Sequence, residues 1–164
     1  MISDTHGYLD PAIEQYFEVC DEIWHLGDFG SADVAARLAS IRPLKGVYGN
    51  IDGRDIRLQF PLEQRFVCEG LDVYMIHIGG APPRYAPGLK AKLKANPPDI
   101  LLCGHSHILR VMSDKTLGNM LYINPGAAGI QGFHKVRTVL RFEIDNGRPK
   151  NMEAIELGAK AAKR

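Results

Sequence analysis

Short apolar runs that end in glycine and a residue able to bind metal recur along this 164-residue sequence. The first run, Met1-Ile2-Ser3, leads into Asp4-Thr5-His6-Gly7. Later runs lead into Gly27-Asp28, Gly49-Asn50-Ile51-Asp52, His77-Ile78-Gly79-Gly80 and Gly104-His105-Ser106-His107. Short apolar runs bounded by turn residues are typical of buried strands. We therefore expect each motif to lie at the end of a strand, and we treat the motifs as one dispersed site.

Helical patterns lie between the first apolar runs. A helix is predicted over 9–20, with Asp10 as its N-cap, and another over 31–40, with Ser31 as its N-cap. Strands are predicted on either side of the second helix, over 22–26 and 44–48. Alternating strands and helices indicate an α/β protein with a parallel sheet and crossover helices. Ligands bind beyond the carboxyl ends of the strands in such sheets, which is where each motif falls.

The second half of the chain is predicted to be richer in hairpins. Strands are expected over 65–69, 72–76, 100–103, 121–123, 136–144 and 151–157, with a loop over 79–87 and a basic helix over 88–95. Gly70-Leu71 and Asn146-Gly147 are the hairpin signals, and a further turn is expected at 124–126. Residues 1–157 are predicted to form a single domain, and residues 158–164 a frayed tail.

Composition excludes some classes of protein. Twenty basic and nineteen acidic side chains give a formal net charge of +1, which supplies no broad basic surface for nucleic acid. Cys20, Cys68 and Cys103 are widely spaced in apolar surroundings, which indicates buried free thiols in a reducing compartment. The sequence shows neither a signal peptide pattern nor an apolar run of membrane-spanning length. We expect a cytoplasmic protein without membrane contact, and a homo-oligomer stays possible.

Seven residues of the motifs are candidate metal ligands: Asp4, His6, Asp28, Asn50, His77, His105 and His107. Residues two apart lie on one side of an extended backbone, so Asp4 and His6 are expected to reach one ion, and His105 and His107 form a second pair at the same spacing. Seven oxygen and nitrogen ligands exceed the needs of one tetrahedral zinc. They suit two divalent ions that share one carboxylate. A hydroxide bridging the two ions would then attack a phosphorus centre in line.

In this order, the motifs resemble the motif set of the calcineurin-like metallophosphoesterases. The opening Ile-Ser-Asp-Thr-His-Gly and Ile123-Asn124-Pro125-Gly126 resemble the compact bacterial phosphodiesterase branch of that superfamily, the YfcE type. The resemblance spans residues 1–157. It implies a four-layer αββα sandwich of two mixed β-sheets flanked by helices, with the metals at the edge of the sheets.

The resemblance also implies roles for the candidate ligands. One ion would be bound by Asp4, His6 and His107, the other by Asn50, His77 and His105, with Asp28 bridging the two. Asp28, Asn50 and His77 are assigned as catalytic, and Asn50 is also expected to contact the substrate phosphate. Manganese is the expected metal, with nickel, zinc, iron and cobalt as alternatives.

Two positions depart from the family pattern. Larger members carry a histidine after the motif asparagine, assigned to protonating the leaving group, whereas this chain has Ile51. The compact branch commonly lacks that histidine, so good leaving groups or phosphodiesters are the expected substrates. Family members also usually carry more of the first strand before Ile2, so we expect either a trimmed chain or a late start.

Other polar residues have weaker assignments. Arg54 and Arg84 are predicted in loops, where they either bind phosphate oxygens or remain solvated. His134 is either a loop residue or a substrate contact, and the segments 79–87 and 127–135 are expected to shape the pocket. His25 is expected to be a buried, hydrogen-bonded residue behind the ligands. Asp28 could alternatively cap a helix, Asn50 complete a turn, and His77 be an ordinary strand histidine.

The function predicted from these residues is hydrolysis of a small phosphodiester by a metal-dependent phosphoric ester hydrolase. The alternative is a scaffold for protein partners that has lost catalysis, like the small subunit of the retromer coat. A scaffold is free to lose ligands, and all seven positions are filled here, which favours the enzyme. A nuclease would require a basic groove or an additional domain.

Overall fold

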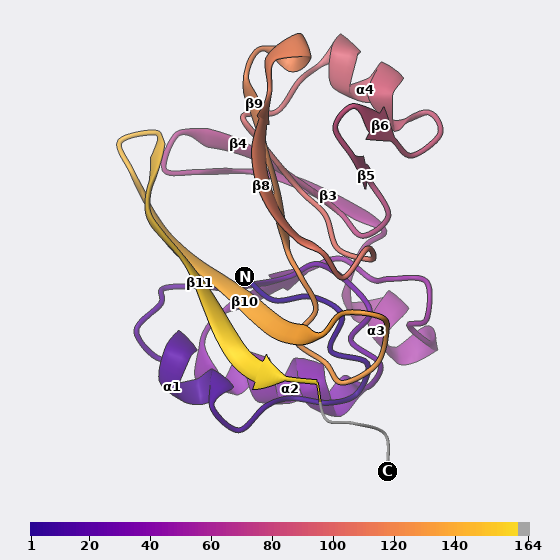
Figure 1. Cartoon of the computed structure of the whole chain (residues 1–164), viewed down its shortest axis with the longest axis vertical. Coiled ribbons are helices and arrows are strands. Elements are labelled where there is room, and N and C mark those ends of the chain that lie inside the picture. The colour runs from indigo at the N-terminus through magenta and orange to yellow at the C-terminus, as the bar shows by residue number, and fades with distance from the viewer. Residues whose placement is uncertain (161–164) are drawn as a thin grey trace.

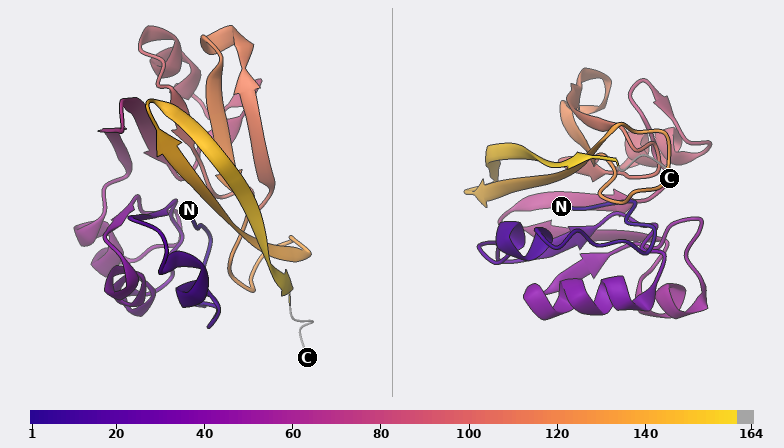
Figure 2. Two further views of the ribbon diagram at one scale, coloured as in Figure 1. Left: turned by 90° about the vertical axis from the view of Figure 1, so that its left-hand side faces the viewer. Right: turned by 60° about the horizontal axis from the view of Figure 1, so that its bottom comes forward.

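Two β-sheets pack face to face between helices in this computed structural model, which describes residues 1–160 (Figure 1). In the first sheet β1 (Ile23–His25) pairs in parallel with β2 (Leu44–Gly46), and Ile2 bridges in parallel to β1. The long hairpin of β10 (Val136–Asp145) and β11 (Arg148–Ala159) lies against the N-terminal end of the chain (Figure 2). The backbone amino and carbonyl groups of Met1 both bond to Leu140 of β10, at 2.6 and 3.1 Å.

The second sheet has five strands in the order β3-β4-β7-β9-β8. Its strands are β3 (Glu63–Cys68), β4 (Leu71–Ile76), β7 (Ile100–Leu102), β8 (Leu109–Asp114) and β9 (Met120–Pro125). The three central strands β4, β7 and β9 run parallel, and the outer strands β3 and β8 are antiparallel to their neighbours. The sheet is therefore mixed, and the carboxyl ends of its central strands point to one edge.

Strand alternation separates three apolar clusters, which are the three interfaces of a four-layer sandwich. Val73 and Met75 of β4 face the cluster between the sheets, together with Trp24 of β1. Tyr74, between them in sequence, faces the opposite side and packs against Leu93 of α4 (Leu89–Ala95). Ile2 and Ile23 pack on the other outer side against Phe17 of α1 (Ile13–Phe17) and Leu38 of α2 (Ala32–Ile41). The predicted fold class is confirmed.

The helix predicted over 9–20 is wrong in extent, because only α1 forms. Asp10 does not cap a helix: its carboxylate accepts a hydrogen bond from the Ala12 amide at 2.9 Å and pairs with Arg137 of β10. The Arg42 side chain donates to the carbonyls of Glu18 and Cys20, which satisfies groups that a continued helix would have used. The Ser31 N-cap is confirmed, since its hydroxyl accepts from the Val34 amide at 3.4 Å.

Several short elements were not predicted, and the bounds of the last strand are wrong. Helix α3 (Arg54–Gln59) has no side-chain N-cap, and β8 is an edge strand exposed at every position except its last, so neither shows the usual periodicity. The predicted loop 79–87 contains a small hairpin of β5 (Gly80–Ala81) and β6 (Arg84–Tyr85). β11 continues to Ala159, two residues into the predicted tail, and 161–164 lie outside the described residues. A 3₁₀ turn, Lys115–Leu117, joins β8 to β9.

Candidate metal centre

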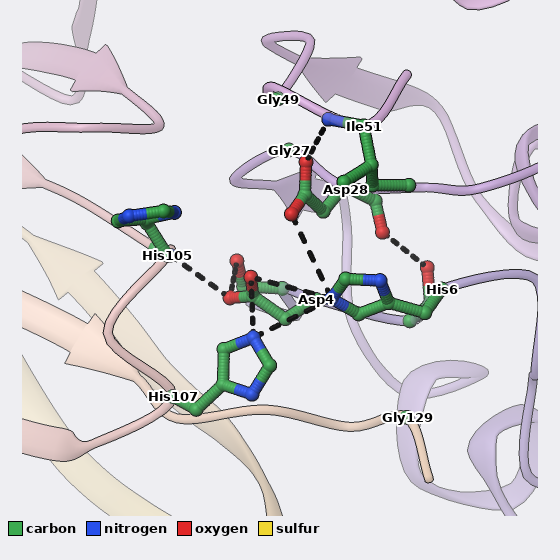
Figure 3. A network of polar contacts seen from close by, with 12 residues as sticks. Asp4, His6, Gly27, Asp28, Gly49, Ile51, His105, His107 and Gly129 are labelled. Atoms are coloured by element: carbon green, nitrogen blue, oxygen red, sulfur yellow. Dashed lines mark hydrogen bonds and ion pairs between the residues drawn. The ribbon is translucent and has the colours of Figure 1, made fainter. Parts of the chain in front are cut away.

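The predicted ligands converge from both sheets. Asp4 and His6 follow the N-terminal segment beside β1, Asp28 follows β1, Asn50 follows β2, His77 follows β4, and His105 and His107 follow β7. Parallel strands place their carboxyl ends at one edge of a sheet, and the packed sheets bring their two edges together. Within the residues that the structure describes, two groups can each hold a metal ion: Asp4, His6 and His107, and Asp28, His77 and His105. Figure 3 shows Asp4, His6, Asp28, His105 and His107 gathered in one place.

The first group is compact. Nε2 of His107 lies 3.1 Å from Oδ1 of Asp4 and 3.4 Å from Nε2 of His6. Asp4 is fully buried and its Oδ2 is already committed, because it accepts from the Ser3 hydroxyl at 2.6 Å and from the His105 amide at 3.1 Å. Asp4 Oδ1 therefore faces the two imidazole nitrogens.

The second group shares its carboxylate with the first. Oδ2 of Asp28 lies 3.3 Å from Nε2 of His77 and 3.6 Å from Nε2 of His6, so it stands between the two groups. Oδ1 of Asp28 accepts from the Ile51 amide at 3.1 Å. The amide oxygen of Asn50 lies 3.2 Å from Nε2 of His77, which adds an oxygen ligand to this group.

The donor set fits divalent metal ions. Among the described residues, Asp4 Oδ1 is one of three buried side-chain polar atoms without a hydrogen-bond partner. Leaving a buried carboxylate oxygen without a partner is costly, and a cation at this point would satisfy it. Imidazole nitrogens beside carboxylate and amide oxygens suit the transition metals from manganese to zinc.

Hydrogen bonds fix the ligand nitrogen of His77. Its Nδ1 lies 2.7 Å from the Leu26 carbonyl, which can only accept, so Nδ1 carries the proton and Nε2 is free to bind a metal. Burial alone would lower the pKa of His77, but Asp28 and Asp4 outweigh it and raise that pKa. Burial would raise the pKa of Asp28, but the neighbouring His77, the hydrogen bond from the Ile51 amide and the charge of His6 together outweigh burial and lower that pKa. Asp28 is therefore an ionised carboxylate at neutral pH.

The backbone at the ligands corrects one assumption from the sequence. Asp4, His6, Asp28, His105 and His107 all have positive φ, between 48° and 66°. Asp4 and His6 thus converge through left-handed residues, and the extended geometry predicted for them is wrong. His105 and His107 have the same left-handed backbone but lie in different groups. Left-handed backbone is uncommon for residues other than glycine and concentrates at functional sites.

His25 lies behind the ligands and is fully hydrogen-bonded. Its Nδ1 accepts from the Gly27 amide at 3.1 Å, so its Nε2 carries the proton that faces Thr5 Oγ1 at 3.0 Å. The Thr5 hydroxyl in turn donates to the Phe29 carbonyl at 3.0 Å. His25 thereby joins the segment that carries Asp4 to the loop that carries Asp28.

The motif around Asn50 is held by a carboxylate to which the sequence gave no site role. Asp52 is buried, and its oxygens accept from the Gly49 amide at 2.7 Å and the Gly30 amide at 2.9 Å. Gly49 has no room for a side chain, since an added Cβ would lie 2.0 Å from Oδ1 of Asp28. Small size at this position allows the loop to approach the carboxylate.

The three candidate substrate contacts lie in different places. Arg54 begins α3 and Arg84 lies in β6, so the predicted placement of both in loops is wrong, and both residues are exposed. Neither side chain hydrogen-bonds to the ligands in the part of the chain that the structure describes. Arg57, one turn along α3, donates to the carbonyl of Asn50 at 3.4 Å and of Asp52 at 2.7 Å. His134 contacts the ligand His107, at 3.2 Å between their Nδ1 atoms.

Comparison with known proteins gives the class to which this fold and site belong. Residues 1–147 match the family model of the calcineurin-like phosphoesterase superfamily domain. The chain is therefore a member of the calcineurin-like phosphoesterase superfamily, and its Asp/His groups are candidate metal-binding clusters.

Particular relatives cover nearly the whole chain. A protein of Methanothermobacter thermautotrophicus named "Probable metallophosphoesterase" is 30% identical over 97% of this chain and 92% of its own length. A solved archaeal phosphodiesterase aligns with a TM-score of 0.75 and 21% identity, covering 95% of this chain and 97% of the other. Vps29 from Entamoeba histolytica, solved with Zn²⁺, aligns with a TM-score of 0.71 and 17% identity, covering 94% and 96%. The two structural likenesses support the fold.

No helix among the described residues is long and apolar enough to cross a membrane.

Proposed function

We propose that this chain is a phosphodiesterase that uses two divalent metal ions, with manganese as the metal expected first. The observation that carries the proposal is the position of Asp28, whose Oδ2 faces the histidines of both groups at 3.3 and 3.6 Å. One carboxylate between two sets of ligands suits a pair of ions that share it. When bound, the ions supply positive charge that stabilises the phosphoryl oxygens and lowers the pKa of water.

The residues of the chain have distinct roles in this proposal. Asp4, His6 and His107 hold one ion, and Asn50, His77 and His105 hold the other, with Asp28 between them. Since the amide oxygen of Asn50 faces His77, its NH₂ group is free to donate to a phosphate oxygen.

The leaving group receives little help from the neighbouring side chain. Ile51 is 46% exposed beside Asp28, and its side chain has no proton to donate. A good leaving group departs without protonation, so aryl phosphodiesters are suitable test substrates. We expect hydrolysis of monoesters, with their additional negative charge, to be slower.

The test is hydrolysis of bis(p-nitrophenyl) phosphate beside p-nitrophenyl phosphate. The protein is stripped of metal and supplied with manganese, nickel, zinc or magnesium. Asp28→Ala removes the shared carboxylate, and Asp21→Asn, in an exposed turn, is the matched control. We expect metal-dependent diester turnover that is lost in Asp28→Ala and retained in Asp21→Asn. Two bound ions without turnover under any metal would refute the enzyme and favour the scaffold.

A further inference from the structure

The segment between β9 and β10 reaches back to the first group of ligands. Its His134 lies beside His107, with Nδ1 atoms 3.2 Å apart and ring centroids 5.1 Å apart. The other ring nitrogen of His134, Nε2, lies 2.9 Å from the Gly129 carbonyl. Both nitrogens of this ring therefore have partners within the chain.

The carbonyl determines where the protons lie. Gly129 O can only accept, so Nε2 of His134 carries a proton and, in the neutral ring, Nδ1 is an acceptor. Nδ1 of His107 must then donate to it, which leaves Nε2 of His107 without a proton. That nitrogen is the one that faces Asp4 Oδ1 at 3.1 Å.

The same segment is joined to the backbone of the other ligand. The Gly129 amide donates to the Asp4 carbonyl at 3.0 Å, so Gly129 binds Asp4 through its amide and His134 through its carbonyl. A continuous path of hydrogen bonds thus connects Asp4 to His107, which are 103 positions apart in the sequence.

Close packing reinforces this path at Gly132. Gly132 has φ of +113°, and an added Cβ would lie 2.1 Å from Nδ1 of His107. Lys160 donates through its amide to the Lys135 carbonyl at 2.9 Å and through its ammonium to the Gly132 carbonyl. The end of β11 therefore braces the segment against the ring of His107.

We propose that His134 is a positioning residue that fixes the orientation and tautomer of the metal ligand His107 and ties it to the backbone of Asp4. This inference deepens the proposed function, since it assumes that the first group binds an ion. It assigns His134 neither to substrate nor to metal, because both its nitrogens already have partners. Hydrogen bonds behind metal-bound histidines typically change metal affinity by about 10–100-fold.

Three variants separate this role from simple loop stability. His134→Asn keeps an acceptor, because Oδ1 of asparagine occupies the same place in the side chain as Nδ1 of histidine. His134→Leu has similar size but no acceptor. Phe133→Ala changes the adjacent, fully exposed residue, at 104% relative exposure, and is the matched control.

The first measurement is long-range ¹H–¹⁵N NMR of the imidazoles in the metal-free protein. We expect the His107 proton on Nδ1 in the wild type, in Phe133→Ala and in His134→Asn, and a mixture of tautomers in His134→Leu. A wild-type His107 with its proton on Nε2, or a His134→Leu spectrum unchanged from wild type, would overturn the proposal.

The second measurement is calorimetric titration with Zn²⁺ alone. We expect His134→Leu to weaken one of two binding steps by about 10–100-fold, while His134→Asn and Phe133→Ala stay within about threefold of wild type. Equal affinity in His134→Leu and the wild type would overturn the role of His134. If the wild type binds two ions but hydrolyses no ester, the proposed function fails and the role of His134 stands. If the wild type binds no Zn²⁺, the proposal that His134 strengthens metal binding fails as well.

Discussion

The left-handed backbone at His105 leads to an unusual prediction about how replacing this residue changes stability. Its φ is +66°, its side chain is exposed, and its amide donates to Asp4 Oδ2, a bond that any replacement except proline retains. We compare His105→Gly with His105→Ala, since both remove the imidazole ligand and differ only in Cβ. Without metal, the glycine variant should be the more stable of the two.

The magnitude follows from two opposing effects. A Cβ in left-handed backbone costs about 1–2 kcal/mol, which glycine avoids. Glycine loses about 0.5–1 kcal/mol more conformational freedom on folding than alanine does. The difference favours His105→Gly by roughly 0.5–1 kcal/mol. With an m-value of about 2 kcal/mol/M, this corresponds to a urea midpoint higher by about 0.25–0.5 M.

The assay is urea unfolding in the presence of a chelator, followed by circular dichroism. Ala36, an exposed position inside α2, is the control, because Ala36→Gly should lower stability by about 1 kcal/mol. The effect of glycine relative to alanine should thus have opposite signs at 105 and at 36. If His105→Ala proves as stable as His105→Gly, strain at this ligand is absent and the reasoning is wrong.

Three further predictions concern other parts of the fold. Ser31→Ala removes the N-cap of α2 and should lower the free energy of unfolding by about 1 kcal/mol, measured in urea; no change would exclude capping. Burial raises the pKa of Cys103, so this thiol should resist Ellman's reagent at pH 8 until urea unfolds the protein; rapid native labelling, located by mass spectrometry, would contradict this. Hydrogen bonds from Tyr74, which has the larger effect, and from Lys92 lower the pKa of Glu63. The contribution of Glu63 to stability is therefore present above its unfolded pKa of about 4.3 and is lost as the pH falls through the lower folded value. Glu63→Gln should therefore make the urea midpoint less dependent on pH between about 5 and 3, and an unchanged pH profile would count against this.

The sequence predicted the order of the central elements because their apolar patterns are strong. The runs that form β1, β4 and β7 are short, apolar and bounded by glycine or polar residues, and each is found near its expected place. Elements whose stability depends on neighbours were missed. β8 is held by β9 alone at the edge of the sheet, and α3 is a six-residue helix without a side-chain cap. Neither has a periodic signal that the sequence could reveal.

The sequence brought the ligand residues together but gave the wrong local geometry. Strand ends imply convergence, whereas the φ of a single aspartate or histidine depends on contacts with distant segments. Asp4 illustrates this, since its amide donates to the Gly27 carbonyl and its carbonyl accepts from Gly129, both at 3.0 Å. The sequence gave His134 two possible roles, and its contact with His107 depends equally on how the β9–β10 segment returns to the site.

In this site, unfavourable backbone conformations occur together with hydrogen bonds that stabilise them. Left-handed backbone at Asp4, Asp28 and His107 is unfavourable in isolation, so the surrounding structure must hold it. The amides and carbonyls of glycines provide much of that support, because a residue without Cβ can approach the ligands closely. Selection for stability alone does not explain why several aspartates and histidines with left-handed backbone surround a buried carboxylate oxygen that has no hydrogen-bond partner. A cation bound here would explain their convergence, because its charge would satisfy the oxygen and its ligands would have to point to one place.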